Sequence, residues 1–201
     1  MKLNTDEHIG LIGSTGSGKT YWFSHAILPS LSRVLIVDTE NMEFENIQIA
    51  KSNPERLVKA IPKDKPFRWR WIPSPTEEKE DLDLLSRELI RRGHNMTLYI
   101  DELTDFSDAH SISPWFKALF RKARKRDIRL IWATQRPPGV NKWAFDNSIH
   151  KMFFYTSQFD RKRLDELMPG IGDQLGMINW KSYQYIYVGP DGIPKLMEAI
   201  K

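Results

Sequence analysis

Short apolar runs alternate with stretches of helical periodicity along the whole chain. Uninterrupted apolar runs are typical of strands that a parallel sheet buries on both faces. They predict strands at residues 9–12, 34–38, 98–101, 129–134 and 151–155. The periodic stretches predict helices at residues 21–28, 53–61, 76–92, 114–126 and 160–168. Repeated strand–helix–strand units indicate an α/β fold with a mostly parallel, helix-covered sheet, in which ligands bind at the carboxyl ends of the strands.

Local signals refine this outline at three places. Residues 67–71 alternate aromatic and basic side chains, which predicts a half-buried strand with its charges facing outward. Asn53 and Pro54 are suited to the N-cap and the first position of the second helix. The last apolar segments, 183–188 and 194–197, flank a Gly-Pro-Asp-Gly turn, so they predict a C-terminal β-hairpin.

Length and composition limit the classes of protein to consider. The 201 residues suffice for one α/β domain with a sizeable core, and no repeat or long linker divides them, so we expect a single domain of residues 1–201. Cysteine is absent, which excludes disulfides and thiolate metal sites. The N-terminus lacks an apolar signal segment, and no apolar run approaches the roughly 18 residues of a membrane span. We therefore expect a soluble protein that is not secreted and has no membrane span of its own.

The clearest chemical motif is the segment Gly13-Ser14-Thr15-Gly16-Ser17-Gly18-Lys19-Thr20, which matches the pattern G-x-x-x-x-G-K-[ST]. It lies between a predicted strand and a predicted helix, the context in which this pattern cradles phosphate. The glycines let backbone N–H groups turn toward phosphate oxygens, and the helix N-terminus adds partial positive charge. Lys19 is placed to reach the β- and γ-phosphates, and Thr20 to bind Mg²⁺. A glycine- and serine-rich turn is the plain alternative, but the context favours binding of ATP or a related triphosphate.

Two adjacent acids follow the strand at 98–101. If its carboxyl end lies beside the phosphates, Asp101 would hold Mg²⁺, directly or through water. Glu102 would then polarise an attacking water as a general base. The alternative is a strand end whose acids face solvent. The doublet favours hydrolysis over phosphoryl transfer to a small metabolite, because such kinases generally do not need a second acid there.

A polar residue also follows the strand at 129–134. The amide of Gln135 can donate to the γ-phosphate while accepting from the attacking water. From the residues alone, Gln135 is equally a strand-terminal polar residue.

In order and spacing, the segments 13–20, 98–102 and 133–137 resemble the FtsK/HerA superfamily of hexameric, RecA-like (ASCE) P-loop ATPases that translocate DNA. The resemblance runs over about residues 9–137. It implies ATP and Mg²⁺ as cofactors, a homo-oligomeric ring, and an arginine finger from the neighbouring subunit. Arg124, eleven residues before Gln135, occupies the matching place, with Arg121 and Arg126 as competitors.

Within this superfamily the chain is most similar to the genome-packaging ATPases of internal-membrane icosahedral viruses, because its length leaves no room for the accessory domains of the cellular members. The resemblance implies a translocase that packages double-stranded DNA into a preformed capsid. It also implies a capsid vertex or viral membrane protein as partner, and a location in the host cytoplasm or at the packaging vertex of the virion.

The basic residues gather in places that suit an anionic partner. Residues 121–129 hold six basic side chains against one acid, and further clusters lie at Arg68 and Arg70 and at residues 161–163. Such clusters supply the salt-sensitive attraction to DNA phosphates that a motor needs. The plain alternative is a solvated helix face. The loop 104–113 is a weaker candidate for lining a central pore, because it is acidic.

Three other functions stay open at this point. A small-molecule or nucleotide kinase has a P-loop domain of similar size, and residues 120–129 would then form its arginine-rich lid. A filamentous-phage assembly ATPase of the Zot type is a non-motor alternative. The third is an assembly or scaffold protein that binds ATP without useful turnover.

Overall fold

The computed structural model describes residues 7–40, 42–74, 76, 78–181 and 183–199. Within these residues a nine-stranded sheet has the order β3-β4-β2-β5-β6-β1-β7-β8-β9. The strands are β1 (Ile9–Ile12), β2 (Arg33–Val37), β3 (Gln48–Ala50), β4 (Phe67–Trp71), β5 (Met96–Ile100), β6 (Ile128–Thr134), β7 (His150–Phe153), β8 (Tyr185–Val188) and β9 (Pro194–Met197). The pairs from β3 to β7 are parallel, and β8 and β9 add an antiparallel hairpin beside β7.

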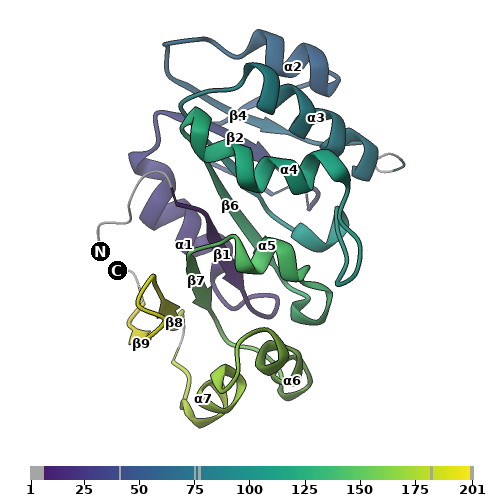
Figure 1. Cartoon of the computed structure of the whole chain (residues 1–201). Helices are drawn as coiled ribbons and strands as arrows, with labels where there is room; N and C mark the ends of the chain where they lie inside the picture. Colours follow the sequence, from purple (N-terminus) through teal and green to yellow (C-terminus); the bar gives the residue numbers. More distant parts are fainter. Residues whose placement is uncertain (1–6, 41, 75, 77, 182, 200–201) are drawn as a thin grey trace.

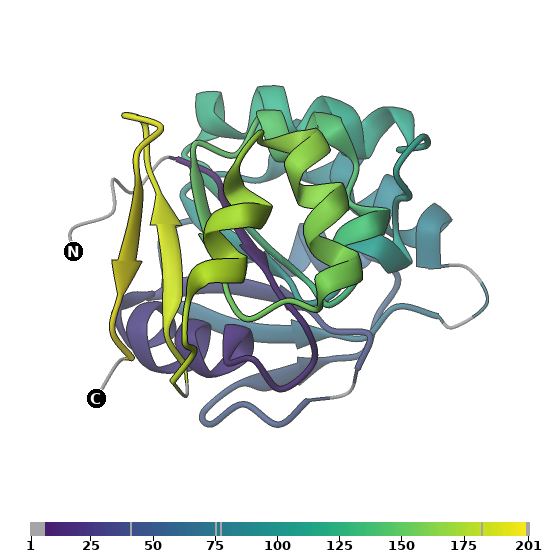
Figure 2. The ribbon, with the colours of Figure 1, turned by 90° about the horizontal axis from the view of Figure 1, so that it is seen from below.

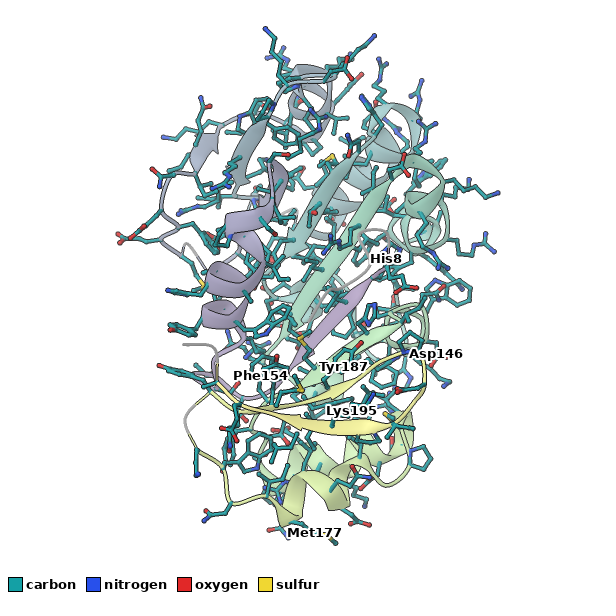
Figure 3. The ribbon with its side chains drawn as sticks, turned by 90° about the vertical axis from the view of Figure 1, so that its left-hand side faces the viewer. His8, Asp146, Phe154, Met177, Tyr187 and Lys195 are labelled. Atoms are coloured by element: carbon teal, nitrogen blue, oxygen red, sulfur yellow. The ribbon has the colours of Figure 1, made fainter. Side chains whose placement is uncertain are left out.

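Because β1 to β7 run in one direction, their ends define two edges of the sheet. We call the edge where these strands end the carboxyl edge, and the opposite one the amino edge. His8, just before β1, and Phe154, beside the last residue of β1, mark the two edges in Figure 3. The segments after β1, β5 and β6 therefore meet at the carboxyl edge, since these three strands are neighbours.

Helices cover both faces of the sheet. The helices α2 (Pro54–Ala60), α3 (Glu78–Arg92), α4 (Pro114–Lys122) and α5 (Lys142–Asp146) lie on one face (Figure 1). On the other face, α1 (Lys19–Trp22) continues as a π-helix (Phe23–Ile27) and a 3-10 turn (Leu28–Ser30), opposite α3 and α4 in Figure 2. The helices α6 (Gln158–Leu167) and α7 (Ile171–Met177) lie beyond the carboxyl end of β7 (Figure 1). No helix in the described part of the chain is long and apolar enough to cross a bilayer.

The alternation of side chains along the central strands builds a core on each face. Leu98 and Ile100 of β5 pack under α3 and α4, whereas Tyr99 between them packs under the α1 side. The same alternation in β6 sends Trp132 to the first core and Ile131 to the second. Both faces are therefore buried, as the uninterrupted apolar runs predict.

One close approach fixes the centre of the sheet. Gly10 of β1 pairs in register with Trp132 of β6, and a Cβ added to Gly10 would lie 2.5 Å from the indole ring. The indole Nε1 donates to Ser148 Oγ at 2.7 Å, which holds the ring over the glycine. Position 10 has no room for a side chain, so its glycine is required by packing rather than by backbone conformation.

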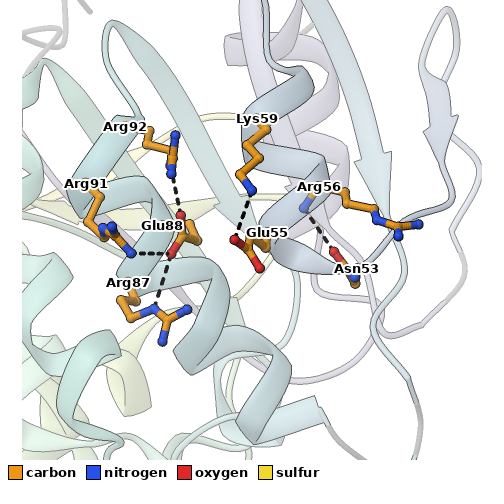
Figure 4. A network of polar contacts seen from close by, with 8 residues as sticks. All are labelled: Asn53, Glu55, Arg56, Lys59, Arg87, Glu88, Arg91 and Arg92. Atoms are coloured by element: carbon orange, nitrogen blue, oxygen red, sulfur yellow. Dashed lines mark hydrogen bonds and ion pairs between the residues drawn. The ribbon is translucent and has the colours of Figure 1, made fainter.

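A buried acid organises the end of α3. The Glu88 side chain is fully buried and accepts from three arginines: Arg87 Nε at 3.2 Å, Arg91 Nη1 at 3.3 Å and Arg92 Nε at 3.1 Å (Figure 4). These guanidinium groups are partly exposed, with side-chain exposures of 37% to 58%. The cluster therefore neutralises the carboxylate inside while its cations stay in contact with water.

A buried histidine joins elements at the amino edge. His8 Nδ1 accepts from the Leu130 N–H at 3.1 Å, so its Nε2 carries the proton and donates to the Phe120 carbonyl at 3.0 Å. Burial lowers the pKa of His8 to about 4, which keeps the ring neutral at pH 7. His8 therefore connects β1 to β6 and α4 as a neutral structural group.

The predicted elements correspond closely to the observed ones, but several bounds differ; the helix expected at 114–126, for example, is α-helical only to Lys122 and continues as a 3-10 turn (Ala123–Arg126). The first helix begins at Lys19 rather than at residue 21 and turns into a π-helix. The helix expected at 76–92 begins at Glu78, and Glu77 of its expected acidic first turn lies outside the described residues. Residues 1–6, where no signal segment is expected, also lie outside the described residues. The short elements β3, α5 and α7 were not expected.

The strand at 67–71 corrects the expectation of outward-facing charges. Arg70 is only 7% exposed and forms an ion pair with Asp38, which follows β2, at 3.1 Å. Arg68 donates to the carbonyls of Leu31 at 2.9 Å and Pro29 at 3.2 Å. β4 has strand neighbours on both sides, β2 and β3, and both of its arginines have partners inside the chain.

Candidate active site

The segment 13–20 forms a loop fixed by the ends of two neighbouring strands. The Gly13 N–H donates to the Thr134 carbonyl at 3.2 Å, and the Ser14 N–H to the Tyr155 carbonyl at 2.8 Å. Gly18 has φ 105°, a left-handed conformation that glycine adopts without strain. The loop thus leads from β1 directly into α1 at the carboxyl edge, the geometry that turns backbone N–H groups toward an anion.

Lys19 is the first residue of α1 and is buried in this loop. Its Nζ donates to the carbonyls of Gly13 at 2.8 Å and Ser14 at 3.0 Å. Burial lowers the pKa of Lys19 to about 8, against the opposing charges of Glu102 and Asp101. The ammonium therefore lies inside the loop with two carboxylates in its electrostatic field.

Thr20 and Asp101 approach each other from α1 and the end of β5. The Thr20 hydroxyl lies 3.5 Å from Asp101 Oδ1, and the Tyr99 hydroxyl donates to the same oxygen at 2.7 Å. Burial raises the pKa of Asp101 to about 6, although the Tyr99 hydrogen bond opposes this. Burial and the nearby Asp101 raise the pKa of Tyr99, whose ring stacks on Phe23 at 3.7 Å.

The oxygen atoms of Thr20 and Asp101 are ligands of the kind that Mg²⁺ prefers. Mg²⁺ at phosphate sites is usually bound by one or two protein oxygens together with phosphates and water. Among the described residues no group of three or more histidines and acids is arranged to hold a metal ion alone. The donor set therefore fits Mg²⁺ bound with a phosphate ligand.

A second acid supports this strand end. The Asp101 N–H donates to the Val37 carbonyl at 3.1 Å, which brings Asp38 beside Asp101 on the neighbouring strand. The charge of Asp38 contributes to the raised pKa of Asp101. The sequence indicates Asp38 as a strand-terminal carboxylate, but not its pairing with Arg70, because that contact depends on the order of the strands.

Glu102 is held by donors from two segments. Its carboxylate accepts from the Thr134 hydroxyl at 2.7 Å, the Gln135 N–H at 2.7 Å and the Thr104 N–H at 3.0 Å. The side chain of Gln135 accepts from the Thr15 hydroxyl of the loop. One polar network therefore joins the loop 13–20, the acids after β5 and the residue after β6. Sequence reasoning missed Thr104 and Thr134, although Thr134 stands next to Gln135.

Arg124 lies far from this network within the chain. It belongs to a 3-10 turn (Ala123–Arg126) that ends just before β6 begins, so it lies at the amino edge, about 20 Å from the carboxyl edge at the usual rise of a strand. Arg124 is exposed, as is its competitor Arg121, and Arg126 is half-buried. The structure does not bring any of these three arginines to the Lys19 of its own chain. It also places residues 120–129 away from the loop that a kinase lid would cover.

The other basic candidates differ in their freedom to bind DNA. Arg163 Nη1 is paired with Glu166, and Arg161 Nε donates to the Thr156 carbonyl. Among the described residues, Arg124 and Lys125 form no ion pair, and both are exposed. The segment 121–126 is therefore the more open basic surface.

The glycine-rich loop at the carboxyl edge of a mostly parallel sheet defines the class: the chain has the fold of a P-loop NTPase. The genome packaging NTPase B204 of Sulfolobus turreted icosahedral virus 2, in complex with AMPPCP, superimposes with a TM-score of 0.78 at 18% identity, covering 98% of this chain and 100% of that one. VirB4 of Thermoanaerobacter pseudethanolicus gives a TM-score of 0.67 at 11% identity, covering 99% and 93%. The expected resemblance to viral genome-packaging ATPases is confirmed for the fold.

Similarity in sequence is more limited. Protein P9 of Pseudoalteromonas phage PM2 is 28% identical over 139 residues, which cover 67% of this chain and 62% of the phage protein. The match thus spans less than two thirds of that curated relative. No protein-family model matches the chain.

Proposed function

We propose that the chain is an ATP-hydrolysing DNA translocase that packages double-stranded viral DNA into a preformed capsid. The observation that carries this proposal is the network in which Thr15, Gln135 and Glu102 join the phosphate loop to the ends of β5 and β6. Such a network links a nucleotide to the group that activates water. The fold shared with a genome packaging NTPase over nearly the whole chain supports the choice of cargo.

In the proposed site, residues 13–20 bind the triphosphate through their backbone N–H groups. Lys19 contacts the β- and γ-phosphates, which its buried position inside the loop supports. Thr20 and Asp101 hold Mg²⁺. When bound, the ion neutralises charge that develops on the phosphates. The hydroxyl of Tyr99 keeps the Asp101 carboxylate oriented toward Thr20.

Hydrolysis is assigned to Glu102 and Gln135. Glu102 accepts a proton from the water that attacks the γ-phosphorus, and Gln135 orients this water and contacts the γ-phosphate. The hydroxyl of Thr134 and the N–H of Thr104 fix the carboxylate during this step. A base fixed in this position favours attack by water over phosphoryl transfer to a small-molecule acceptor.

The working form is proposed to be a homo-oligomeric ring, most simply a hexamer of single-domain subunits (residues 1–201). Arg124 lies at the opposite edge from its own site, so it can act as an arginine finger only on the nucleotide of a neighbouring subunit. Arg121 and Arg126 are its alternatives. A ring of this kind would act at a capsid vertex, in the host cytoplasm or on the virion, with a vertex or viral membrane protein as partner.

The test is ATP hydrolysis by the purified protein with and without long double-stranded DNA at low salt. We expect DNA to stimulate hydrolysis and Glu102→Gln to lower the stimulated rate by about 100-fold or more, the usual contribution of a general base. The matched control is Glu88→Gln, which removes a buried acid at the amino edge. Phosphoryl transfer to a nucleotide acceptor without DNA dependence, or full activity of Glu102→Gln, would refute the proposal.

A further inference from the structure

A pocket of about 420 Å³ opens directly beside the phosphate loop. One wall consists of residues 15–17 of the loop, and the other of Tyr155, Trp180, Lys181, Tyr183 and Gln184. Its volume lies within the range of about 300–1,000 Å³ that is usual for pockets that enclose small ligands. Because the loop itself forms one wall, a triphosphate held in it would place its nucleoside in or next to this pocket.

Aromatic rings form the outer wall. The Tyr183 ring packs on the loop, since a Cβ added at Gly18 would lie 2.5 Å from Tyr183 Cδ1. One face of this ring stacks on Tyr21 at 4.8 Å, while the residue remains 45% exposed. Tyr155 is 48% exposed, and Trp180 meets it edge-on at 6.2 Å. Flat ring surface is therefore open toward the pocket and is held in place by neighbouring rings.

The amide and indole groups of this wall are already hydrogen-bonded. Gln184 accepts from the Lys181 N–H at 2.9 Å and donates to the Glu198 carboxylate at 3.0 Å. The Trp180 Nε1 donates to the Leu175 carbonyl at 3.1 Å. An amide that has its partners has little capacity left to read the edge of a base. Among the side chains of this wall, the rings offer stacking, and the exposed Lys181 offers a cation.

We propose that this pocket is the base-binding subsite of the enzyme and that it holds a nucleobase by stacking on Tyr155 and Tyr183 with little discrimination among bases. The inference rests on the proposed function, in that residues 13–20 must bind the triphosphate. Stacking is tolerant of base identity because every base has a π-face. The chain would accordingly use ATP, GTP, CTP and UTP alike.

The test is calorimetric titration of the full chain with AMPPCP, with the corresponding GTP, CTP and UTP analogues, and with inorganic tripolyphosphate. We expect the four nucleotides to bind within about 5-fold of one another, and each about 10-fold or more tighter than tripolyphosphate, the usual gain from stacking one base. Tyr155→Leu and Tyr183→Leu should each remove most of this gain and leave tripolyphosphate binding unchanged. Tyr155→Phe should restore it, because phenylalanine keeps the ring.

Control variants distinguish a loss of base binding from a loss of the fold or of phosphate binding by the loop. Trp115→Ala removes an aromatic side chain of similar exposure, 40%, outside the pocket, and should change neither affinity. Unchanged tripolyphosphate binding in the leucine variants shows that the loop is folded. Nucleotide affinity that survives both leucine substitutions, or a preference above about 100-fold for one base, overturns the subsite alone. Failure of wild-type protein to bind either nucleotide or tripolyphosphate overturns the proposed function, and the subsite with it.

Discussion

Two buried carboxylates in this molecule have opposite surroundings. Glu88, near the amino edge, is enclosed by the guanidinium groups of Arg87, Arg91 and Arg92 (Figure 4). Asp101, at the carboxyl edge, accepts from the Tyr99 hydroxyl and stands beside Asp38, a second acid. The first acid is satisfied by cations on its own helix. Among the described residues the second accepts hydrogen bonds from neutral donors, with the Lys19 ammonium as a nearby cation, and its pKa is raised to about 6.

This contrast distinguishes acids that stabilise the fold from acids that are suited to bind a ligand. A carboxylate with three cationic partners gains nothing from a further cation and loses its partners if it moves. A carboxylate beside another acid has excess negative charge, which a bound divalent cation would relieve. Burial alone therefore does not identify a functional acid, whereas the kind of partner does.

The largest effect is expected at a guanidinium that lacks an acid partner among the described residues. Arg124→Ala should lower DNA-stimulated hydrolysis by about 10³-fold in the assembled protein, because an arginine finger acts on the transition state. Stability should not change, since the side chain is exposed. The measurement is ATPase activity under conditions where sedimentation shows assembly, with Lys125→Ala as control. Full activity of Arg124→Ala would transfer the role to Arg121 or Arg126.

The free energy of unfolding of Asp101→Asn, compared with wild type as a function of pH, tests the contrast between the two acids. The pKa of Asp101 is raised from 3.8 to about 6 on folding, so its stabilising contribution is complete below pH 4 and is lost as the pH rises through 6. Asparagine does not ionise. The variant should therefore gain up to about 3 kcal/mol over wild type between pH 4 and pH 7, at about 1.4 kcal/mol per pH unit.

Urea unfolding of both proteins at pH 4, 5.5 and 7 measures this difference. The same variant should lose hydrolysis, because asparagine is a poor ligand for Mg²⁺. A stability difference that stays constant with pH would mean that Asp101 is not desolvated as the structure indicates.

The smallest effect is expected at Glu88. Glu88→Gln should destabilise the fold by about 1–2 kcal/mol, less than a fully buried ion pair, because the three arginines regain water when the charge is lost. Hydrolysis per folded molecule should be unchanged. Glu55→Gln is the matched control, since it removes an acid that is 47% exposed and paired with Lys59, and surface pairs contribute little. Loss of hydrolysis in Glu88→Gln would contradict a purely structural role.

Much of the fold is predictable from the sequence because buried parallel strands have continuous apolar runs. The bounds of β4 and β9 agree with the prediction. The strand β3 was missed because it has three residues, is the outermost strand beside β4 and is largely exposed. Its pairing with β4, rather than its composition, makes it a strand. The helices α5 and α7 are too short for periodicity to reveal.

The candidate site also has residues that the sequence predicts and residues that it does not. Residues 13–20, Asp101, Glu102 and Gln135 follow strands, so the ends of those strands predict where they lie. Their partners do not follow from sequence. Thr104 contacts Glu102 because of a local turn, and Arg70 meets Asp38 only because β4 lies next to β2. The contact of Tyr99 with Asp101 could have been predicted, because Tyr99 stands two residues before Asp101 and residues two apart in a strand lie on the same face.

The contact of Gly10 with the indole of Trp132 has a consequence for evolution. Any side chain at position 10 meets the ring at 2.5 Å, and the ring is held by Ser148. A mutation at position 10 is therefore tolerated only after the residue at 132 has become smaller, and a smaller residue there leaves a cavity that a larger residue at 10 can fill. Across descendants of this chain, the two positions should change as a correlated pair.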